Sequence, residues 1–427
     1  MVRRRLVSKA NTRLYMPVPE FALRKRREII ESLLSEPEIT DYLDQQPESQ
    51  REPLRNTARR YAREIGPRFN AFFYFRLGRF LARTLLRMHF RIRVVDIDDR
   101  VLSGVAPDAT VVLISNHRSN FDPLVITYLA SQRSTIALSA GEWARLWPLH
   151  HLVRAAGGFV VDRDAADELY KRVLAAYIRV SAAAGLHQAV FPEGELSRDG
   201  RMSQPKLGFL SYICRACSRK RDIVFIPVSI NYDRIPEDRR LAYAEGSFEN
   251  PKASFLIRSS LRYVATVLAL PFRRRSHRFG HVGICFDAPL SLKHWLETRG
   301  VDIADADAAG RNKWLPQLAN ELMQRCARRI PVPPVPLAAA AILSHPERTR
   351  WDEVALRDTM TGVERQLAGK GAFVYLPDDL QSGSRFALDM LLHNGLLEPA
   401  EGGSFTVNES GRAVLQHYAN SIEHLLA

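Results

Sequence analysis

The sequence has few cysteines, and their spacing excludes a disulfide scaffold. Only four occur in 427 residues, without the dense, regular pattern of a small secreted domain. Cys214 and Cys217 form a C-x-x-C pair. A zinc site would need a second such pair, and a thioredoxin-like site would need a different context. We therefore interpret both as buried helical cysteines without chemistry.

Long apolar runs are also missing. The most apolar charge-free stretches, such as residues 263–272 and 337–343, fall well below the roughly 20 residues that a spanning helix needs. Residues 1–21 are basic but lack an apolar segment behind the charges, so they do not form a signal peptide. We expect a protein that is cytosolic or lies on a membrane without crossing it.

Acidic residues are the minority among the charged ones. The chain has 47 Asp and Glu against 61 Lys and Arg, a formal net charge of +14. This excess predicts an anionic partner, which could be nucleic acid, an acidic membrane or an anionic substrate. The remaining composition, 46% hydrophobic and 25% charged, is that of a globular protein long enough for more than one domain.

A proline-rich segment, PVPPVP at 331–336, predicts an extended linker because proline cannot continue a helix. The charge balance changes across it. Residues 337–427 hold 7 basic and 12 acidic residues, a net charge of −5, so the rest of the chain carries +19. We predict an N-terminal helical region at 1–95, a catalytic domain at 96–330 and a small helix-rich domain at 337–427.

Before about residue 95 the spacing is helical. Four arginines fall on one helix face: Arg76, Arg79, Arg83 and Arg87. Four apolar residues fall on the opposite face, behind an aromatic run at 72–75: Leu77, Leu81, Leu85 and Met88. This pattern suits an anionic membrane interface. It equally suits a helix packed on the domain with its arginines in water, because periodicity alone does not separate the two.

From about residue 109 to 287, short apolar strands alternate with helical stretches. This alternation predicts an α/β fold with a mainly parallel sheet flanked by helices. Functional residues are then expected where strands end and loops begin. The predicted strands are 110–115, 188–191, 223–229 and 281–286, and the predicted helix is 165–184.

The first of three polar junctions, NHRSNFD at 116–122, follows the strand at 110–115. Ser119 could cap a helix, and Asp122 three residues later would complete a capping box. That leaves His117 unexplained. An imidazole held by a carboxylate takes a proton from an alcohol in many enzymes, and a turn between strand and helix could bring His117 and Asp122 together.

Two further junctions carry cations. GGFVVDR at 157–163 ends in Arg163, which could bind phosphate or pair with a nearby aspartate. FPEGELSRDGR at 191–201 combines a glycine with a serine and arginines, and a lysine follows it. Such a loop could cradle a phosphate or could be an ordinary solvated loop. Its candidate residues are Glu193, Gly194, Ser197, Arg198, Arg201 and Lys206.

Taken in order, these pieces resemble four sequence blocks of the glycerolipid acyltransferase superfamily. The blocks are His117 with Asp122, Gly158 through Arg163, Phe191 through Gly194 with Ser197 and Arg198, and Ile226 through Val228 with Tyr232. Each is modest alone. Four in the right order on predicted strand ends make coincidence improbable.

Within that superfamily the chain resembles the bacterial membrane-associated glycerol-3-phosphate acyltransferases. The first block reads His117-Arg118-Ser119, which is typical of that branch. Further likeness extends over most of residues 55–427, at 58–65, 204–206, 280–292 and 418–426. The chain is short for the branch. It also has Leu196 where the family usually has arginine, which leaves the acceptor open.

The resemblance implies that His117 is a general base oriented by Asp122, and that it activates the hydroxyl of glycerol 3-phosphate. The hydroxyl would attack acyl-CoA or acyl-carrier protein and make lysophosphatidic acid for phospholipid biosynthesis. Arg163, Arg198 and Lys206 would bind the acceptor phosphate, and Glu193, Gly194 and Ser197 would shape its pocket. No cofactor or metal is implied. The protein would lie peripherally on the cytoplasmic face of the cell membrane.

Other functions stay open. The acceptor could instead be lysophosphatidic acid or dihydroxyacetone phosphate. A nucleic-acid-binding protein is a different class, in which 349–417 would form a helix-rich module with a small wing at 402–406. That module is the acidic part of the chain, which argues against DNA. A non-enzymatic lipid-surface scaffold is the third class, and His117 and Asp122 argue against it.

Overall fold

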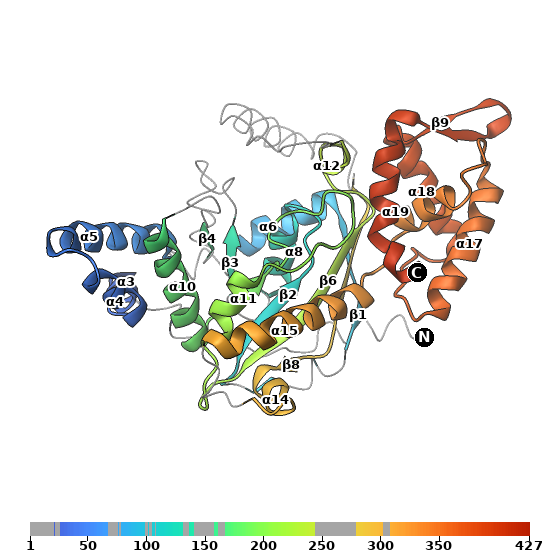
Figure 1. Ribbon diagram of the computed structural model, residues 1–427. Helices are drawn as coiled ribbons and strands as arrows, with labels where there is room; N and C mark the ends of the chain where they lie inside the picture. The colour runs from blue at the N-terminus through green and yellow to red at the C-terminus, as the bar shows by residue number, and fades with distance from the viewer. Residues whose placement is uncertain are drawn as a thin grey trace.

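A mixed, mainly parallel sheet forms the centre of the molecule, and helices cover both of its faces (Figure 1). The computed structural model describes the following residues: 21, 26–66, 76, 78–98, 101, 105–106, 108–130, 136–140, 158–160, 167–243, 279–301 and 308–427. The predicted fold class, an α/β sheet with flanking helices, a helical N-terminal region and a helix-rich C-terminal part, is confirmed.

The sheet has the strand order β1-β7-β6-β2-β5-β3-β4, with β8 paired to β6. The β7–β6 and β6–β8 pairs are antiparallel and the others are parallel. The strands are β1 (Arg91–Ile97), β2 (Thr110–Ser115), β3 (Ile136–Ala140), β4 (Phe159–Val160), β5 (His187–Val190), β6 (Ile223–Tyr232), β7 (His281–Phe286) and β8 (Leu290–Ser291).

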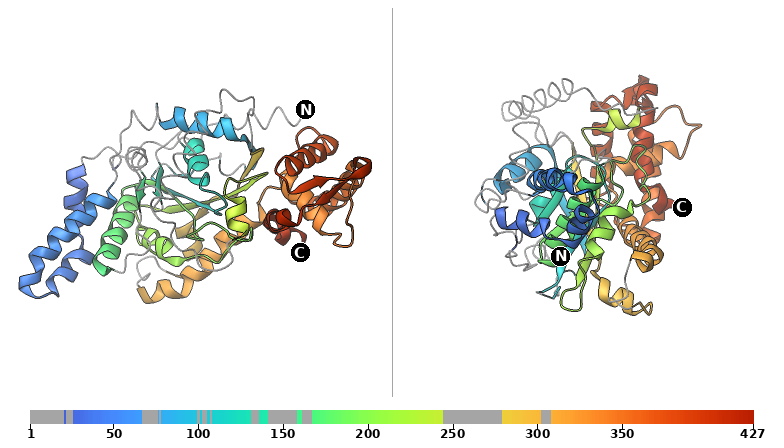
Figure 2. Two further views of the ribbon diagram at one scale, coloured as in Figure 1. Left: turned by 90° about the horizontal axis from the view of Figure 1, so that it is seen from above. Right: turned by 60° about the vertical axis from the view of Figure 1, so that its left-hand side comes forward.

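Alternation along the central strands divides the core in two. On β2, Val112 and Ile114 belong to one apolar cluster, whereas Val111 and Leu113 belong to the cluster on the other face. The first face is covered by α10 (Glu168–Ala183), α11 (Leu207–Cys214), α14 (Leu292–Glu297) and α15 (Ala308–Arg328). The second face is covered by α6 (Arg79–His89), α8 (Asp122–Ala130) and α12 (Asp238–Ala242). Figure 2 shows the two layers from above.

Three N-terminal helices extend one end of the molecule and pack against α10. They are α3 (Arg26–Leu34), α4 (Pro37–Asp44) and α5 (Glu48–Ile65). Their buried side chains, including Leu33, Ile39 and Ile65, continue the first apolar cluster of the sheet. The predicted helix at 165–184 and the strands at 110–115 and 281–286 are confirmed closely by α10, β2 and β7.

The apolar face that the sequence predicted for α6 is wrong, whereas its arginines are exposed as predicted. Arg79, Arg83 and Arg87 are exposed, as is Arg76 before the helix. The buried stripe is Ala82, Leu86 and His89, at the four- and three-residue spacing of a helix that packs on α8. Leu85 and Met88 are only half-buried, and Leu81 is 37% exposed. Leu77 and the aromatic run at 72–75 lie outside the described residues.

The C-terminal part has an apolar cluster of its own, built almost wholly from residues 332–426. Its elements are α16 (Pro334–Leu343), α17 (Glu353–Gly369), α18 (Leu380–His393), β9 (Leu397–Pro399), β10 (Phe405–Val407) and α19 (Arg412–Leu426), with short 3₁₀ turns at Glu401–Gly403 and Glu409–Gly411. Because this part has an apolar core of its own, we propose that the three predicted units are domains. The proposal keeps their bounds at 1–95, 96–330 and 337–427.

The prediction of an extended linker over the whole of 331–336 is wrong. Pro334 begins α16, because proline suits the first turn of a helix, where its missing N–H has no partner to lose. Val332 pairs with Val374, and both Val332 and Val335 are buried. The segment therefore enters the C-terminal core directly and does not cross solvent.

Candidate active site

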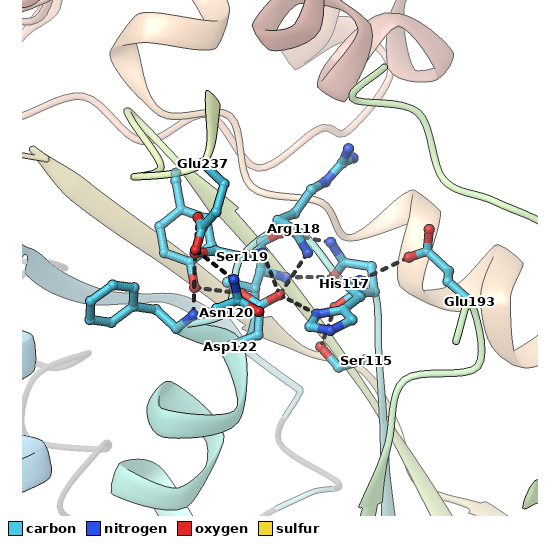
Figure 3. A network of polar contacts seen from close by, with 12 residues as sticks. Ser115, His117, Arg118, Ser119, Asn120, Asp122, Glu193 and Glu237 are labelled. Carbon is cyan, nitrogen blue, oxygen red and sulfur yellow. Dashed lines mark hydrogen bonds and ion pairs between the residues drawn. The ribbon is translucent and has the colours of Figure 1, made fainter. Parts of the chain in front are cut away.

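Two of the three polar junctions, at 116–122 and 191–201, meet the fourth sequence block at the carboxyl ends of neighbouring parallel strands. The first follows β2 at Asn116, the second follows β5 at Phe191, and the fourth block ends β6 at Tyr232. Ligand sites of open α/β sheets form at this edge, because the loops leaving adjacent strands converge there. Figure 3 shows the polar network that these segments build.

His117 and Asp122 are in direct contact, although they are five residues apart. Nδ1 of His117 lies 2.9 Å from Oδ2 of Asp122, and the carboxylate is fully buried. A chain turn between β2 and α8 makes the contact possible (Figure 3). The ring of Phe191 stacks on the imidazole, with centroids 4.4 Å apart. This packing and the ion-pair contact together fix the orientation of the ring.

The same carboxylate also makes the contact that the capping interpretation predicts. Oδ2 of Asp122 also accepts hydrogen bonds from the backbone N–H groups of Arg118 at 2.6 Å and Ser119 at 2.9 Å. The bond from Ser119 is one half of the predicted capping box. Asp122 begins α8, so one side chain both closes the turn and holds the imidazole.

Tyr232 and Asn116 fix this turn to the neighbouring strand. The hydroxyl of Tyr232 donates to Oδ1 of Asp122 at 2.5 Å. Asn116 bonds both backbone groups of Ile230, donating to its carbonyl at 2.8 Å and accepting from its N–H at 2.9 Å. Burial and the charge of Asp122 raise the pKa of Tyr232 well above its ordinary value, so the phenol remains a donor. Both residues come from strand ends that the sequence had marked.

Glu237 was missed in the sequence, and it holds the outer side of the same turn. Its carboxylate accepts from the hydroxyl of Ser119 at 2.9 Å and from the amide of Asn120 at 3.0 Å. Burial raises the pKa of Glu237, and the two donors lower it. No spacing in the sequence relates Glu237 to the turn, since the contact depends on the chain after β6 returning to Ser119 and Asn120. Only the fold reveals this residue.

Glu193 turns inward and holds His117 by its backbone. Oε1 accepts from the N–H of His117 and Oε2 accepts from the N–H of Ser203, each at 2.8 Å. The side chain is 1% exposed. Burial raises the pKa of Glu193, whereas the guanidinium of Arg118 and the two backbone donors lower it. Glu193 therefore ties the first polar segment to the loop that follows β5.

The other predicted residues of this loop differ in exposure, because Ser197 is buried whereas Arg198 and Lys206 are exposed. Ser197 donates its N–H to the carbonyl of His117 at 3.0 Å, which brings the loop alongside His117. Lys206 pairs with Glu195 at 2.8 Å, and Arg198 pairs with the same carboxylate at 3.4 Å. Gly194 has φ +76°, and a Cβ there would lie 2.7 Å from the side chain of Lys206. Only glycine permits this close approach without strain.

Two predicted features contribute no chemistry that the structure describes. Arg163 lies outside the described residues, and only Gly158 and β4 (Phe159–Val160) of that junction are described. Cys214 and Cys217 are free thiols. Burial raises the pKa of Cys214 strongly and that of Cys217 to about 11, so both remain protonated and unreactive. Within the described ranges, no three His, Cys, Asp or Glu residues gather where a metal ion could sit.

Among the described residues, none of the helices combines the length and apolar character that crossing a membrane requires.

Comparison with known proteins gives two family matches. Residues 96–231 match the model "Acyltransferase", and residues 266–427 match "Glycerol-3-phosphate acyltransferase C-terminal region". Relatives named glycerol-3-phosphate acyltransferase, from Pseudomonas paraeruginosa PA7 and Pseudomonas fluorescens SBW25, are each 28% identical over 95% of this chain. The chain spans about half the length of these relatives, 49% in both cases.

One solved structure is also similar. The 1-acyl-sn-glycerophosphate acyltransferase PlsC from Thermotoga maritima has 16% sequence identity and a TM-score of 0.33, over 58% of this chain and 78% of that one. A score this low supports no conclusion about the site.

Proposed function

Because the chain belongs to the acyltransferase superfamily and carries the C-terminal region of the glycerol-3-phosphate acyltransferases, we propose that it acylates glycerol 3-phosphate. The donor would be acyl-CoA or acyl-carrier protein, and the product lysophosphatidic acid, for phospholipid synthesis. The contact between His117 and Asp122 at the carboxyl ends of β2, β5 and β6 carries the proposal. The first block and the described residues of the third and fourth blocks lie at this edge of the sheet.

His117 is arranged as a general base. With Nδ1 donating to Asp122, the imidazole keeps the lone pair on Nε2, and none of the described residues hydrogen-bonds that atom. Nε2 takes the proton of the acceptor hydroxyl as its oxygen attacks the thioester carbonyl. The C–O bond forms, the C–S bond breaks, and the proton passes from Nε2 to the leaving thiolate. Asp122 stabilises the imidazolium that exists in between.

Phosphate recognition is assigned to the loop after β5. Arg198 and Lys206 flank Glu195, and Lys206 is the first cause of the lowered pKa of that carboxyl. An acceptor phosphate would compete with Glu195 for these two cations, which are exposed and lie on the loop that contacts His117. Arg163 remains a candidate from the second block. Gly194, Glu193 and Ser197 would form the wall behind the acceptor.

We also propose peripheral attachment to an anionic membrane through α6. Phe80 is 63% and Leu81 37% exposed, next to the exposed arginines 79, 83 and 87. Apolar residues flanked by arginine on one helix suit the interface of a bilayer. The helix lies beside α8, and the ring of His89 is 5.5 Å from that of Phe121, the residue before Asp122. A lipid product would leave the site close to this surface.

The test is acyl transfer by the purified protein with glycerol 3-phosphate, dihydroxyacetone phosphate and lysophosphatidic acid as separate acceptors. Each would be offered with acyl-CoA and with acyl-carrier protein, and His117→Ala serves as the inactive control. We expect transfer to glycerol 3-phosphate to be the most efficient. Faster transfer to lysophosphatidic acid would replace the proposed acceptor, and no transfer to any acceptor would overturn the function.

A further inference from the structure

Arg118 points away from the catalytic pair and toward the C-terminal part (Figure 3). Its Nη2 donates to the carbonyl of Ser421 in α19 at 3.3 Å. The residue is 3% exposed, and within the described part of the chain its Nε and Nη1 are buried without a hydrogen-bond partner. A buried guanidinium with so few bonds is costly, so the fold has to compensate for it elsewhere.

The compensation comes from nearby carboxylates. The charges of Glu193 and Asp122 favour the cationic form of Arg118, against burial, which lowers its pKa. Burial raises the pKa of Glu193 overall, and the charge of Arg118 is the largest influence that opposes this rise. Glu193 accepts from the backbone N–H groups of His117 and Ser203. The charge of Arg118 thus supports Glu193, which holds the backbone of His117, and α19 in turn contacts Arg118.

Helix α19 also holds the loop after β5 directly. Asn420 donates to the carbonyl of Asp199 at 2.8 Å, and Nδ1 of His417 lies 3.1 Å from the carbonyl of Arg198. Arg201 pairs with Glu423 at 2.7 Å. These contacts reach the loop from residues more than 200 positions away in the chain.

Gly200 is the point of closest approach between loop and helix. Its φ is +89°, and a Cβ added there would lie 1.9 Å from the carbonyl oxygen of His417 and 2.9 Å from its carbon. Both obstructing atoms are backbone, so a side chain could fit only if α19 or the loop moved. The contact therefore requires glycine both for its conformation and for the space.

We propose that α19 positions the acceptor side of the active site, with Arg118 as its contact to the catalytic turn. This rests on the proposed function, because it assigns α19 a part in placing the acceptor for that same reaction. Arg118 acts through Glu193 and so is a positioning residue. The helix would hold the loop that carries Ser197 and Arg198 at the distance from His117 that the acceptor requires. The donor would not depend on it in the same way.

Two glycines offer a matched experiment. Gly300 also has a positive φ, +68°, but nothing lies within 4 Å of the position of its Cβ. Gly200→Ala and Gly300→Ala therefore impose the same kind of backbone strain, and only the first forces α19 from the loop. We expect Gly200→Ala to lower kcat/KM for glycerol 3-phosphate by up to about 10²-fold, the cost of a displacement near 1 Å. The KM for the acyl donor should stay within about twofold of wild type, and Gly300→Ala should resemble wild type in both.

Arg118→Met provides a second test, which does not depend on a Cβ added at position 200. Amide hydrogen exchange would follow the N–H groups of His117 and Ser203, which Glu193 holds, against those of α17 as internal reference. We expect faster exchange at both positions in Arg118→Met and in Gly200→Ala, with α17 unchanged.

The outcomes separate the two proposals. If the wild-type protein acylates no acceptor, the proposed function fails, and amide exchange still decides whether α19 holds the loop. Wild-type kcat/KM for glycerol 3-phosphate together with wild-type exchange in Gly200→Ala would overturn the positioning role. An equal loss of kcat/KM for donor and acceptor, with faster exchange throughout the chain, would also overturn it, because that result describes general unfolding.

Discussion

The hydroxyl of Tyr232 and the carboxylate of Asp122 are joined by a hydrogen bond of 2.5 Å between residues 110 positions apart in the chain. Tyr232 ends β6, and Asp122 begins α8 after the turn that leaves β2. Because β2 and β6 are neighbouring parallel strands, the bond spans the edge of the sheet where His117 lies. The orientation of His117 therefore depends on two strands, and not on its own turn alone.

Tyr232→Phe tests this dependence. The variant removes one donor from a buried carboxylate, a change worth roughly 1.5–3 kcal/mol when the partner is charged. We expect kcat to fall about tenfold and the melting temperature to drop by a few degrees. Asp122 keeps its three donors on Oδ2, so the fold should survive. Steady-state kinetics and a thermal melt are the measurements. Unchanged kcat would show that Tyr232 only fills space.

His117→Ala should reduce transfer by about 10²–10⁴-fold, the usual contribution of a general base. Asp122→Asn should come close to that loss. An asparagine oxygen can still accept from the backbone N–H groups of Arg118 and Ser119, so the turn should persist, but the charge that stabilises the imidazolium is gone. Circular dichroism should report a folded protein in both variants. Near-normal activity in a folded Asp122→Asn protein would reduce that residue to a helix cap.

Much of the sheet could be predicted because its central strands are continuous apolar runs. Residues 110–115 and 281–286 are buried at every position, as expected for strands covered on both faces. Strand β1 was not predicted, because it directly follows the arginine-rich helix and itself alternates arginine with valine and isoleucine. The HxxxxD turn was found from its residue types. Glu237 and the contact of Arg118 with α19 were not, because each depends on chain segments that only tertiary packing brings together.

Acid should destabilise the folded protein through His187. Its Nδ1 accepts from the backbone N–H of Val111 at 3.1 Å inside the sheet, and burial first and Arg221 second lower its pKa from 6.5 to about 4. As the pH falls from 6.5 to 4, the unfolded chain binds a proton that the folded protein does not. The free energy of unfolding therefore decreases across that window, by about 1.4 kcal/mol per pKa unit.

The measurement is the melting temperature at pH 7 and at pH 4.5, for wild type and His187→Asn. The asparagine oxygen can accept from Val111 but does not titrate. We expect a smaller drop in melting temperature in the variant than in wild type. The drop should not vanish, because burial also lowers the pKa of His417 to about 4. An equal drop in both proteins would assign the acid sensitivity to other groups.

Binding to anionic vesicles should depend on α6 and weaken at high salt. Each basic residue near an anionic surface contributes about 1 kcal/mol, screened by ions, whereas Phe80 contributes an apolar part that salt does not screen. Phe80→Ser should lower vesicle sedimentation at every salt concentration. Val354→Ser is the matched control, since Val354 is 55% exposed on α17. Equal losses in the two variants, or binding to neutral vesicles alone, would argue against α6 as the anchor.

Leu196 is where the chain departs from the pattern of the family that it resembles, and the structure shows where the leucine packs. It is half-buried and packs on the apolar cluster between the sheet and α8. Leu196→Arg would lose part of this packing, but a long aliphatic stem can keep the contact while its guanidinium reaches water. If that guanidinium meets the acceptor phosphate, the charge-assisted bond is worth roughly 1.5–3 kcal/mol.

We therefore expect Leu196→Arg to lower KM for glycerol 3-phosphate about tenfold, to leave the donor KM alone, and to lower the melting temperature slightly. Leu196→Met, which conserves volume and apolar character, is the control and should change neither KM. Arg198 and Lys206 are close enough along the loop to support transfer in the wild-type protein without the extra arginine. A stable Leu196→Arg variant with an unchanged acceptor KM would show that position 196 does not face the acceptor, and that leucine is there to hold the loop on the sheet.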